Sequence, residues 1–153
     1  MPSTKASIDI DAPLARVADV LFDFARYGEW NPFIPVIAGE VKQGALLTLH
    51  ARFHSGRRAR TVQYVEVLRR PGDDAELTFL LTGRLENLGL ARVRRTQLLT
   101  RIGMGRTRYL TTEVVTGMAS PLLSLRGDAR GYAEVATALK RRAEALHAGR
   151  GSA

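Results

Sequence analysis

The stretch that decides the fold is residues 7–33, SIDIDAPLARVADVLFDFARYGEWNPF. It predicts a short strand, a helix, and a second, aromatic helix that ends in Asn-Pro, where Asn31 is expected to begin a turn. Asp11 stands where a helix N-cap is favoured, and Pro13 falls in the first turn, where its missing N–H costs no hydrogen bond. The apolar face of the first helix consists of Val17, Val20, Leu21 and Phe24. We therefore expect this helix to lie on a larger structure.

The order Ile-Asp-Ile-Asp-Ala-Pro, then Asp-Phe, then Glu-Trp-Asn-Pro-Phe resembles the opening of the START and polyketide-cyclase-like superfamily, also called SRPBCC or Bet v 1-like. The resemblance continues at Gly-Arg-Thr-Arg (105–108), at Glu113 with Gly117, and into a long terminal helix, and so covers residues 5–147. It implies an α+β helix-grip fold, in which a curved antiparallel β-sheet wraps around a long C-terminal α-helix and two short helices lie near the N-terminus. It also implies one ligand-binding domain over 5–147, followed by a flexible tail over 148–153. Members bind lipids, polyketides or hormones, so the resemblance specifies the fold and leaves the ligand open.

Length and composition fit a single globular domain. The chain has 153 residues, of which 45% are hydrophobic and 25% are charged, as in domains with a substantial core. The absence of cysteine excludes disulfides, thiolate metal ligands and a cysteine nucleophile. No apolar run approaches the roughly 18 residues of a membrane span, and the N-terminus lacks a signal-peptide apolar region. A cytoplasmic location is therefore expected.

The net charge of +8 comes mainly from arginines spread along the chain. Such a charge attracts nucleic acid or anionic surfaces. No aromatic-interleaved basic strand and no known binding motif accompanies these arginines, so nucleic acid is not an expected partner. Solvated strand faces explain the charge more simply.

After Pro35 the sequence alternates in short runs separated by turn signals, which is typical of an antiparallel meander. The predicted strands cover 47–53, 60–69, 76–82, 90–102 and 106–116. A helical pattern of about seven turns begins at Ser120, and residues 149–153 are expected to supply its stop and a frayed tail. Its apolar face consists of Leu122, Leu125, Ala129, Tyr132, Val135, Ala136, Leu139, Ala143 and Leu146. We expect this helix to pack across the concave side of the sheet.

The hairpin formed by 90–102 and 106–116 carries the most informative polar residues. A turn at Gly103-Met104-Gly105 predicts the cross-strand pairs Arg101 with Thr107, Leu99 with Tyr109, Gln97 with Thr111, and Arg95 with Glu113. Alignment with the superfamily places one face of this hairpin toward the interior, namely Arg95, Gln97, Tyr109, Thr111 and Glu113. Isolated buried charges are costly, so if both side chains lie inside we expect Arg95 and Glu113 to pair, and bidentate geometry is one way for them to do so. The pair either orients the polar end of a ligand or only fixes the hairpin.

A curved sheet that grips one helix leaves space between them, and alternate strand positions line that space. The candidate apolar wall consists of Trp30, Phe33, Leu49, Phe53, Phe79, Leu81, Tyr132 and Leu139. Each of these residues also fits an ordinary core position, since large apolar side chains most often form core. The predicted ligand-binding residues are Trp30, Phe33, Leu49, Phe53, Phe79 and Tyr132 from this wall, with Arg95, Gln97, Tyr109, Thr111 and Glu113 from the hairpin.

Several chemistries lack support in the sequence. On a strand, His50 and His54 lie about 13 Å apart at roughly 3.3 Å per residue, too far to share a metal. His147 stands in the helical tail. The sequence has no nucleophile elbow and no phosphate-binding loop, and Gly103-Met104-Gly105 opens no helix. We therefore expect no metal and no cofactor.

The sequence favours binding of a small hydrophobic molecule, such as a lipid or polyketide, with a polar or acidic group. One alternative is a polyketide cyclase- or dehydratase-like enzyme, in which Glu113 moves a proton and Arg95 or Tyr109 stabilises an enolate-like oxygen. An adjacent arginine would keep Glu113 ionised, which suits binding better than proton abstraction. The other alternative is a protein-interaction module that acts through a basic sheet face around 57–60 and 92–95. The sequence leaves a monomer and a homodimer open.

Overall fold

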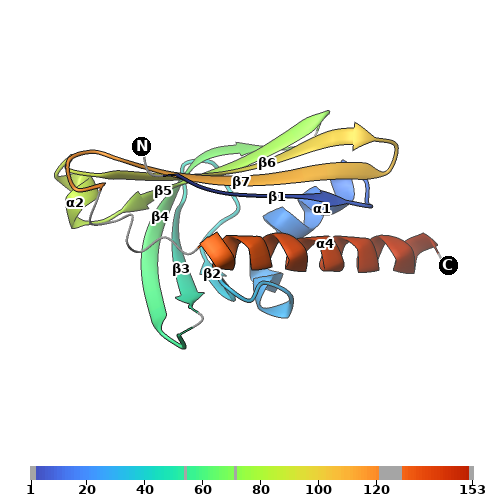
Figure 1. Cartoon of the computed structure of the whole chain (residues 1–153), viewed down its shortest axis with the longest axis horizontal. Helices are drawn as coiled ribbons and strands as arrows, with labels where there is room; N and C mark the ends of the chain where they lie inside the picture. The colour runs from blue at the N-terminus through green and yellow to red at the C-terminus, as the bar shows by residue number, and fades with distance from the viewer. Residues whose placement is uncertain (1–2, 54, 71, 121–128, 152–153) are drawn as a thin grey trace.

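A curved antiparallel sheet and one long helix dominate the structure (Figure 1). The computed structural model describes residues 3–53, 55–70, 72–120 and 129–151. Within these ranges the strands form a seven-stranded sheet in the order β1-β7-β6-β5-β4-β3-β2. The elements are β1 (Ser3–Ile10), α1 (Leu14–Phe22), η1 (Phe24–Glu29), β2 (Val36–Ala38), β3 (Leu46–Arg52), β4 (Arg58–Arg69), β5 (Asp74–Thr82), α2 (Arg84–Asn87), β6 (Arg92–Gly103), β7 (Arg106–Thr116) and α4 (Ala129–Gly151).

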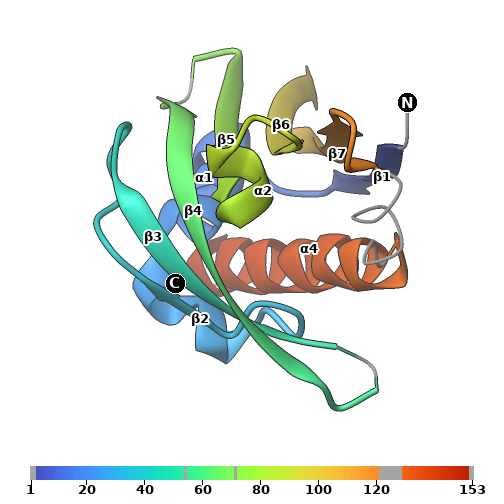
Figure 2. The same cartoon turned by 90° about the vertical axis from the view of Figure 1, so that its left-hand side faces the viewer.

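The sheet curls around α4, as Figure 2 shows in a view from the left-hand side of Figure 1. α4 lies against β1 and packs on α1, which itself contacts β5, β6 and β7. This arrangement confirms the helix-grip fold predicted from the sequence. The helix is described as far as Gly151, which lies within the stop predicted over 149–153. The predicted apolar positions Leu122 and Leu125 lie outside the described residues.

The start of α1 differs from the prediction. Its N-cap position is Pro13, without a side-chain cap, so Asp11 does not cap the helix. The Asp11 carboxylate instead accepts a hydrogen bond from Arg106 Nε (3.1 Å). Its backbone N–H donates to Glu144 Oε1 in α4 (2.8 Å). Asp11 therefore ties the loop before α1 to β7 and α4 instead of stabilising the helix end.

The second N-terminal helix is η1, a 3₁₀ helix that ends at Glu29, before the Asn-Pro at which the sequence predicted its end. Its Tyr27 is buried, and the Tyr27 hydroxyl donates to the carbonyl of Leu21 in α1. This bond holds η1 against α1. The chain then leaves the helix before Pro32, as expected from the restriction that proline places on the preceding residue.

The hairpin of β6 and β7 has the predicted register: Arg101 pairs with Thr107, Leu99 with Tyr109, Gln97 with Thr111, and Arg95 with Glu113. The turn includes Gly105, whose φ of +65° lies in the left-handed region that favours glycine. The short helix α2 between β5 and β6 was not predicted, since its four residues are too few to show a helical period. The pairing confirms that Arg95, Gln97 and Glu113 share the concave face.

The main core fills one end of the concave face, where α1 packs between the sheet and α4. The largest fully buried side chains include Val17, Leu21, Leu47, Leu49, Val65, Leu77, Phe79, Leu99, Tyr109, Val135 and Leu139. Interior side chains of this kind, packed to crystal-like density, supply most of the folding free energy. The concave face extends beyond this core toward the N-terminal end of α4.

Candidate ligand-binding cavity

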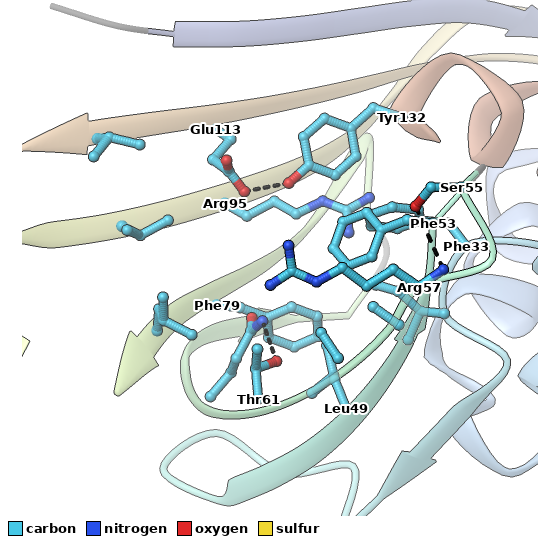
Figure 3. A pocket seen from close by; sticks show the side chains of 17 residues that line it. Phe33, Leu49, Phe53, Ser55, Arg57, Thr61, Phe79, Arg95, Glu113 and Tyr132 are labelled. Carbon is cyan, nitrogen blue, oxygen red and sulfur yellow. Dashed lines mark hydrogen bonds between the residues drawn. The ribbon is translucent and has the colours of Figure 1, made fainter. Parts of the chain in front are cut away.

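A cavity of about 500 Å³ lies between the concave face and α4. Typical small-molecule sites have volumes of about 300–1,000 Å³, so the cavity is of a size to hold a small organic ligand. Figure 3 shows its side chains. They come from the segment before β2, from β3 to β7, from the β3–β4 turn, and from α4: Phe33, Ile34, Leu49, Ala51, Phe53, Ser55, Arg57, Ala59, Thr61, Gln63, Phe79, Leu81, Val93, Arg95, Glu113, Val115 and Tyr132.

One wall of the cavity is built by a turn that follows η1. The buried Asn31 accepts hydrogen bonds through Oδ1 from the backbone N–H groups of Phe33 (3.0 Å) and Ile34 (2.8 Å). This confirms the turn predicted at Asn31, since an asparagine side chain favours such local bonds. The turn places Phe33 edge-on to Phe53 and Tyr132, with ring centroids 5.4 and 5.8 Å apart. Three aromatic rings thereby close one side of the cavity.

Arg95 lies against the Tyr132 ring of this wall, with only 6% of its surface exposed. Its Nε donates to Thr111 Oγ1 (3.2 Å), and its guanidinium carbon lies 4.3 Å from the centre of the Tyr132 ring. Its Nη2 is buried without a hydrogen-bond partner. Burial alone lowers the pKa of Arg95, but nearby Tyr109, Tyr132 and Glu113 raise it above its ordinary value. Arg95 is therefore a permanent buried cation with unused donor capacity.

Glu113 faces the same space from β7, where it accepts a hydrogen bond from the hydroxyl of Tyr132 (Figure 3). Burial raises the pKa of Tyr132, so this hydroxyl remains a protonated donor at neutral pH. The predicted ion pair is wrong: within the part of the chain that the structure describes, Arg95 and Glu113 form none. The phenol satisfies one carboxylate oxygen and its ring covers the guanidinium, so Tyr132 contacts both charges.

Three buried polar side chains of β6 and β7, Gln97, Tyr109 and Thr111, form a layer next to Arg95. The hydroxyl of Tyr109, which is fully buried, donates to Gln97 Oε1 (2.8 Å), and burial raises the pKa of Tyr109. Thr111 is also fully buried and accepts the bond from Arg95. These three side chains do not line the cavity. The Thr111 bond restricts the position of the guanidinium directly, whereas the Tyr109 bond joins that residue to Gln97 in the layer.

The sequence matches a known family over almost its full length. The family, described as polyketide cyclase / dehydrase and lipid transport, matches residues 1–148. The chain belongs to this family. The match confirms the superfamily inferred from the sequence. No curated protein matches the chain.

Several solved structures share the architecture of this chain at low sequence identity. The Zhui aromatase/cyclase from Streptomyces sp. R1128 is 15% identical, with a TM-score of 0.66 over 93% of each chain. Truncated norcoclaurine synthase from Thalictrum flavum is 10% identical, with a TM-score of 0.67 over 91% of each chain. A hypothetical protein of Helicobacter pylori is 12% identical, with a TM-score of 0.70 over 92% of this chain and 87% of its own. At such identities the likeness shows the fold and carries no information on the reaction.

Of the ligand-binding residues predicted for this family member, the cavity is lined by Phe33, Leu49, Phe53, Phe79, Arg95, Glu113 and Tyr132. It is not lined by Trp30, Gln97, Tyr109 and Thr111. Trp30 packs instead on Tyr27, with ring centroids 4.8 Å apart. Of the wider apolar wall, Leu81 lines the cavity and Leu139 belongs to the core.

The sequence interpretation missed the polar contribution of β4 and the turn before it. Arg57, Thr61 and Gln63 line the cavity, yet none was among the predicted binding residues. They stand at alternate positions, and side chains of a strand alternate between its two faces. This two-residue period could have predicted that these side chains face the cavity. The sequence interpretation instead assigned residues 57–60 to a basic outer face of the sheet.

The basic sheet face predicted around 57–60 and 92–95 is divided between two sides of the sheet. Arg57 and Arg95 line the cavity. On the outer side, Arg92 and Arg94 pair with Glu66, at 3.3 and 2.7 Å. Strand alternation therefore removes Arg57 and Arg95 from the outer basic face.

The described ranges contain neither a cluster of metal ligands nor a candidate membrane-spanning helix. Within them, histidine, aspartate and glutamate form no group of three or more that could hold a metal ion. Similarly, none of the helices described combines the length and hydropathy required to cross a bilayer.

Proposed function

We propose that this protein binds a small hydrophobic molecule with a polar end in the cavity between the sheet and α4. The observation that carries the proposal is the combination of an aromatic wall with a buried, incompletely bonded guanidinium in a space of about 500 Å³. Buried polar groups are costly unless they have partners, and a ligand with a polar end would supply one. The family description, which names polyketide cyclases and lipid transport, supports the same class of ligand.

Native mass spectrometry of the freshly purified protein, compared with the same sample denatured, tests this proposal. We expect a small molecule that is retained in the native state and released on unfolding, or binding of an added aromatic alcohol such as 2-naphthalenemethanol. Ala51→Trp places a large ring in the cavity and is expected to abolish binding. His50→Trp, on the exposed face of the same strand, is the matched control. Equal binding by both variants would contradict a ligand site in this cavity.

A second candidate is a polyketide cyclase- or dehydratase-like enzyme, which the contact between Tyr132 and Glu113 favours. A phenol and a carboxylate that share a proton donor–acceptor bond beside a fixed cation are suited to move a proton and to stabilise an oxyanion. Tyr109, predicted as an oxyanion stabiliser, does not line the cavity. Tyr132 takes that position in the proposed reaction.

Incubation with a linear poly-β-ketone, followed by mass spectrometry, tests the enzymatic proposal. Ring closure with dehydration lowers the substrate mass by one water. We expect Glu113→Gln to slow this loss of water at least tenfold, while the variant still binds the poly-β-ketone. Equal rates for the variant and the wild type would exclude Glu113 as the acid–base group.

A further inference from the structure

We propose that the preferred ligand is a monocarboxylate, held with its carboxylate between Arg95 and Arg57 and its hydrophobic part against the aromatic wall. The inference rests on the proposed binding function and specifies the ligand class. Three observations carry it: the unpartnered donor of Arg95, the position of Arg57, and the charge balance of the cavity.

Arg95 provides the fixed half of the site. Its Nε bond to Thr111 and its stacking on Tyr132 hold the guanidinium plane in place. The buried Nη2 has no hydrogen-bond partner in the protein, so the guanidinium keeps unmet donor capacity, and Arg95 is one of the residues that line the cavity. A guanidinium presents two parallel N–H groups to a planar carboxylate, and this charge-assisted arrangement is stronger than a bond to a neutral hydroxyl.

Arg57 provides the solvent-exposed half. It comes from the residue just before β4, and its side chain extends into the cavity from the side opposite to Arg95 (Figure 3). Among the described residues it forms no ion pair, and its surface is exposed. An exposed cation is screened by salt, whereas a buried one is screened much less. Arg57 is therefore suited to cover the carboxylate after it has reached Arg95.

The charges around the cavity favour one negative charge on the ligand. Its charged lining residues are Arg57, Arg95 and Glu113, which leaves one net positive charge. A monoanion neutralises this charge. A phosphate monoester, which is close to a dianion at pH 7, would bring its second negative charge near Glu113 and be repelled.

Matched naphthalene compounds separate the head group from the hydrophobic part. The cavity of about 500 Å³ has room for roughly 17 groups of water size at about 30 Å³ each, which is enough for a naphthalene ring with one substituent. We would measure binding of 2-naphthoate, 2-naphthalenemethanol and 2-naphthyl phosphate by calorimetry at low and high salt. The variants are Arg95→Met, Arg57→Met and Glu113→Gln. Arg60→Met, at an exposed position of β4 that does not line the cavity, is the control.

The wild type is expected to bind 2-naphthoate at least tenfold more tightly than the alcohol and more tightly than the phosphate. Arg95→Met should remove the preference for the acid and change the affinity for the alcohol less than threefold. Arg57→Met should weaken acid binding about threefold and reduce its salt dependence. Glu113→Gln should narrow the gap between the acid and the phosphate, and Arg60→Met should change none of these values.

Different failures overturn different claims. If the alcohol binds the wild type as tightly as the acid, the cavity is a ligand site and the carboxylate inference is wrong. An acid preference that survives in Arg95→Met would likewise overturn the role of that residue. If no naphthalene compound binds and Ala51→Trp changes nothing, the proposed binding function itself fails. Should Arg95→Met not fold, Arg95→Lys keeps the charge without the planar fork and is expected to lose most of the acid preference.

Discussion

Replacing Arg95 with methionine separates a ligand-binding role of this residue from a structural one. A residue that only fixes the hairpin should stabilise the ligand-free protein. A residue retained for a ligand should instead cost stability when the ligand is absent, as active-site groups often do. The structure allows an estimate of which effect prevails.

The contacts of the guanidinium are few. Its hydrogen bond to Thr111 contributes about 1.5–3 kcal/mol, because the donor is charged. Its stacking on Tyr132 contributes about 0.5–2 kcal/mol. Against these gains, a buried ion loses several kcal/mol of hydration. The buried Nη2 without a partner adds about 1–3 kcal/mol to this cost.

The two sides nearly cancel, so we expect Arg95→Met to leave the unfolding free energy unchanged within about 1 kcal/mol, or to raise it. A change of 1 kcal/mol corresponds to a shift in Tm of about 2–4 °C in a chain of this size. Urea and thermal unfolding would be measured after the protein has been unfolded and refolded to remove bound small molecules. Arg60→Met should change the free energy by less than about 0.5 kcal/mol and serves as the surface control. A loss above about 2 kcal/mol in Arg95→Met alone would refute the reasoning and assign Arg95 a structural role.

Three further substitutions test the core packing, the turn that builds the cavity wall, and the loss of stability at acidic pH. Leu139→Ala, in the core, should lower the unfolding free energy by about 2–5 kcal/mol, whereas Leu146→Ala, 39% exposed, should cost far less in the same urea titration. Asn31→Ala leaves two backbone N–H groups without their acceptor, so a loss of about 1–3 kcal/mol is expected; an unchanged midpoint would argue against the turn. Burial raises the pKa of Glu144, but hydrogen bonds from Lys140 and a backbone N–H outweigh it and lower the pKa. This carboxylate therefore stabilises the fold above its ordinary pKa and loses that effect as the pH falls through the lowered value. Stability measured between pH 6 and pH 2 should decline less steeply in Glu144→Gln, and equal slopes would contradict the assignment.

The register of the β6–β7 hairpin was predictable because local signals fix it. The glycines at 103 and 105 define the turn, and the two-residue period then determines every facing side chain. Arg95 opposite Glu113 follows directly from this count. The turn at Asn31 was predictable for a similar reason, since its bonds reach only two and three residues along the chain.

Contacts that depend on tertiary placement were not predictable. The apparent N-cap Asp11 binds Arg106 and Glu144, which lie far away in the sequence. Tyr132 stands between Arg95 and Glu113 because α4 crosses the concave face at that point, and no local pattern encodes the crossing. Charge complementarity alone therefore predicted a direct ion pair that the folded chain replaces with a bridging phenol.

The position of the cavity follows from how far α1 reaches along the concave face. At the end covered by α1, the inward residues of the sheet are apolar, as at Leu77 and Leu99. The next inward positions of β6 are Gln97 and then Arg95, where a continuous apolar core would have been more stable. A fold under selection for stability alone has no reason to place a hydrogen-bonded polar layer and a cation at this boundary. The layer thus marks where core packing ends and where the proposed ligand site begins.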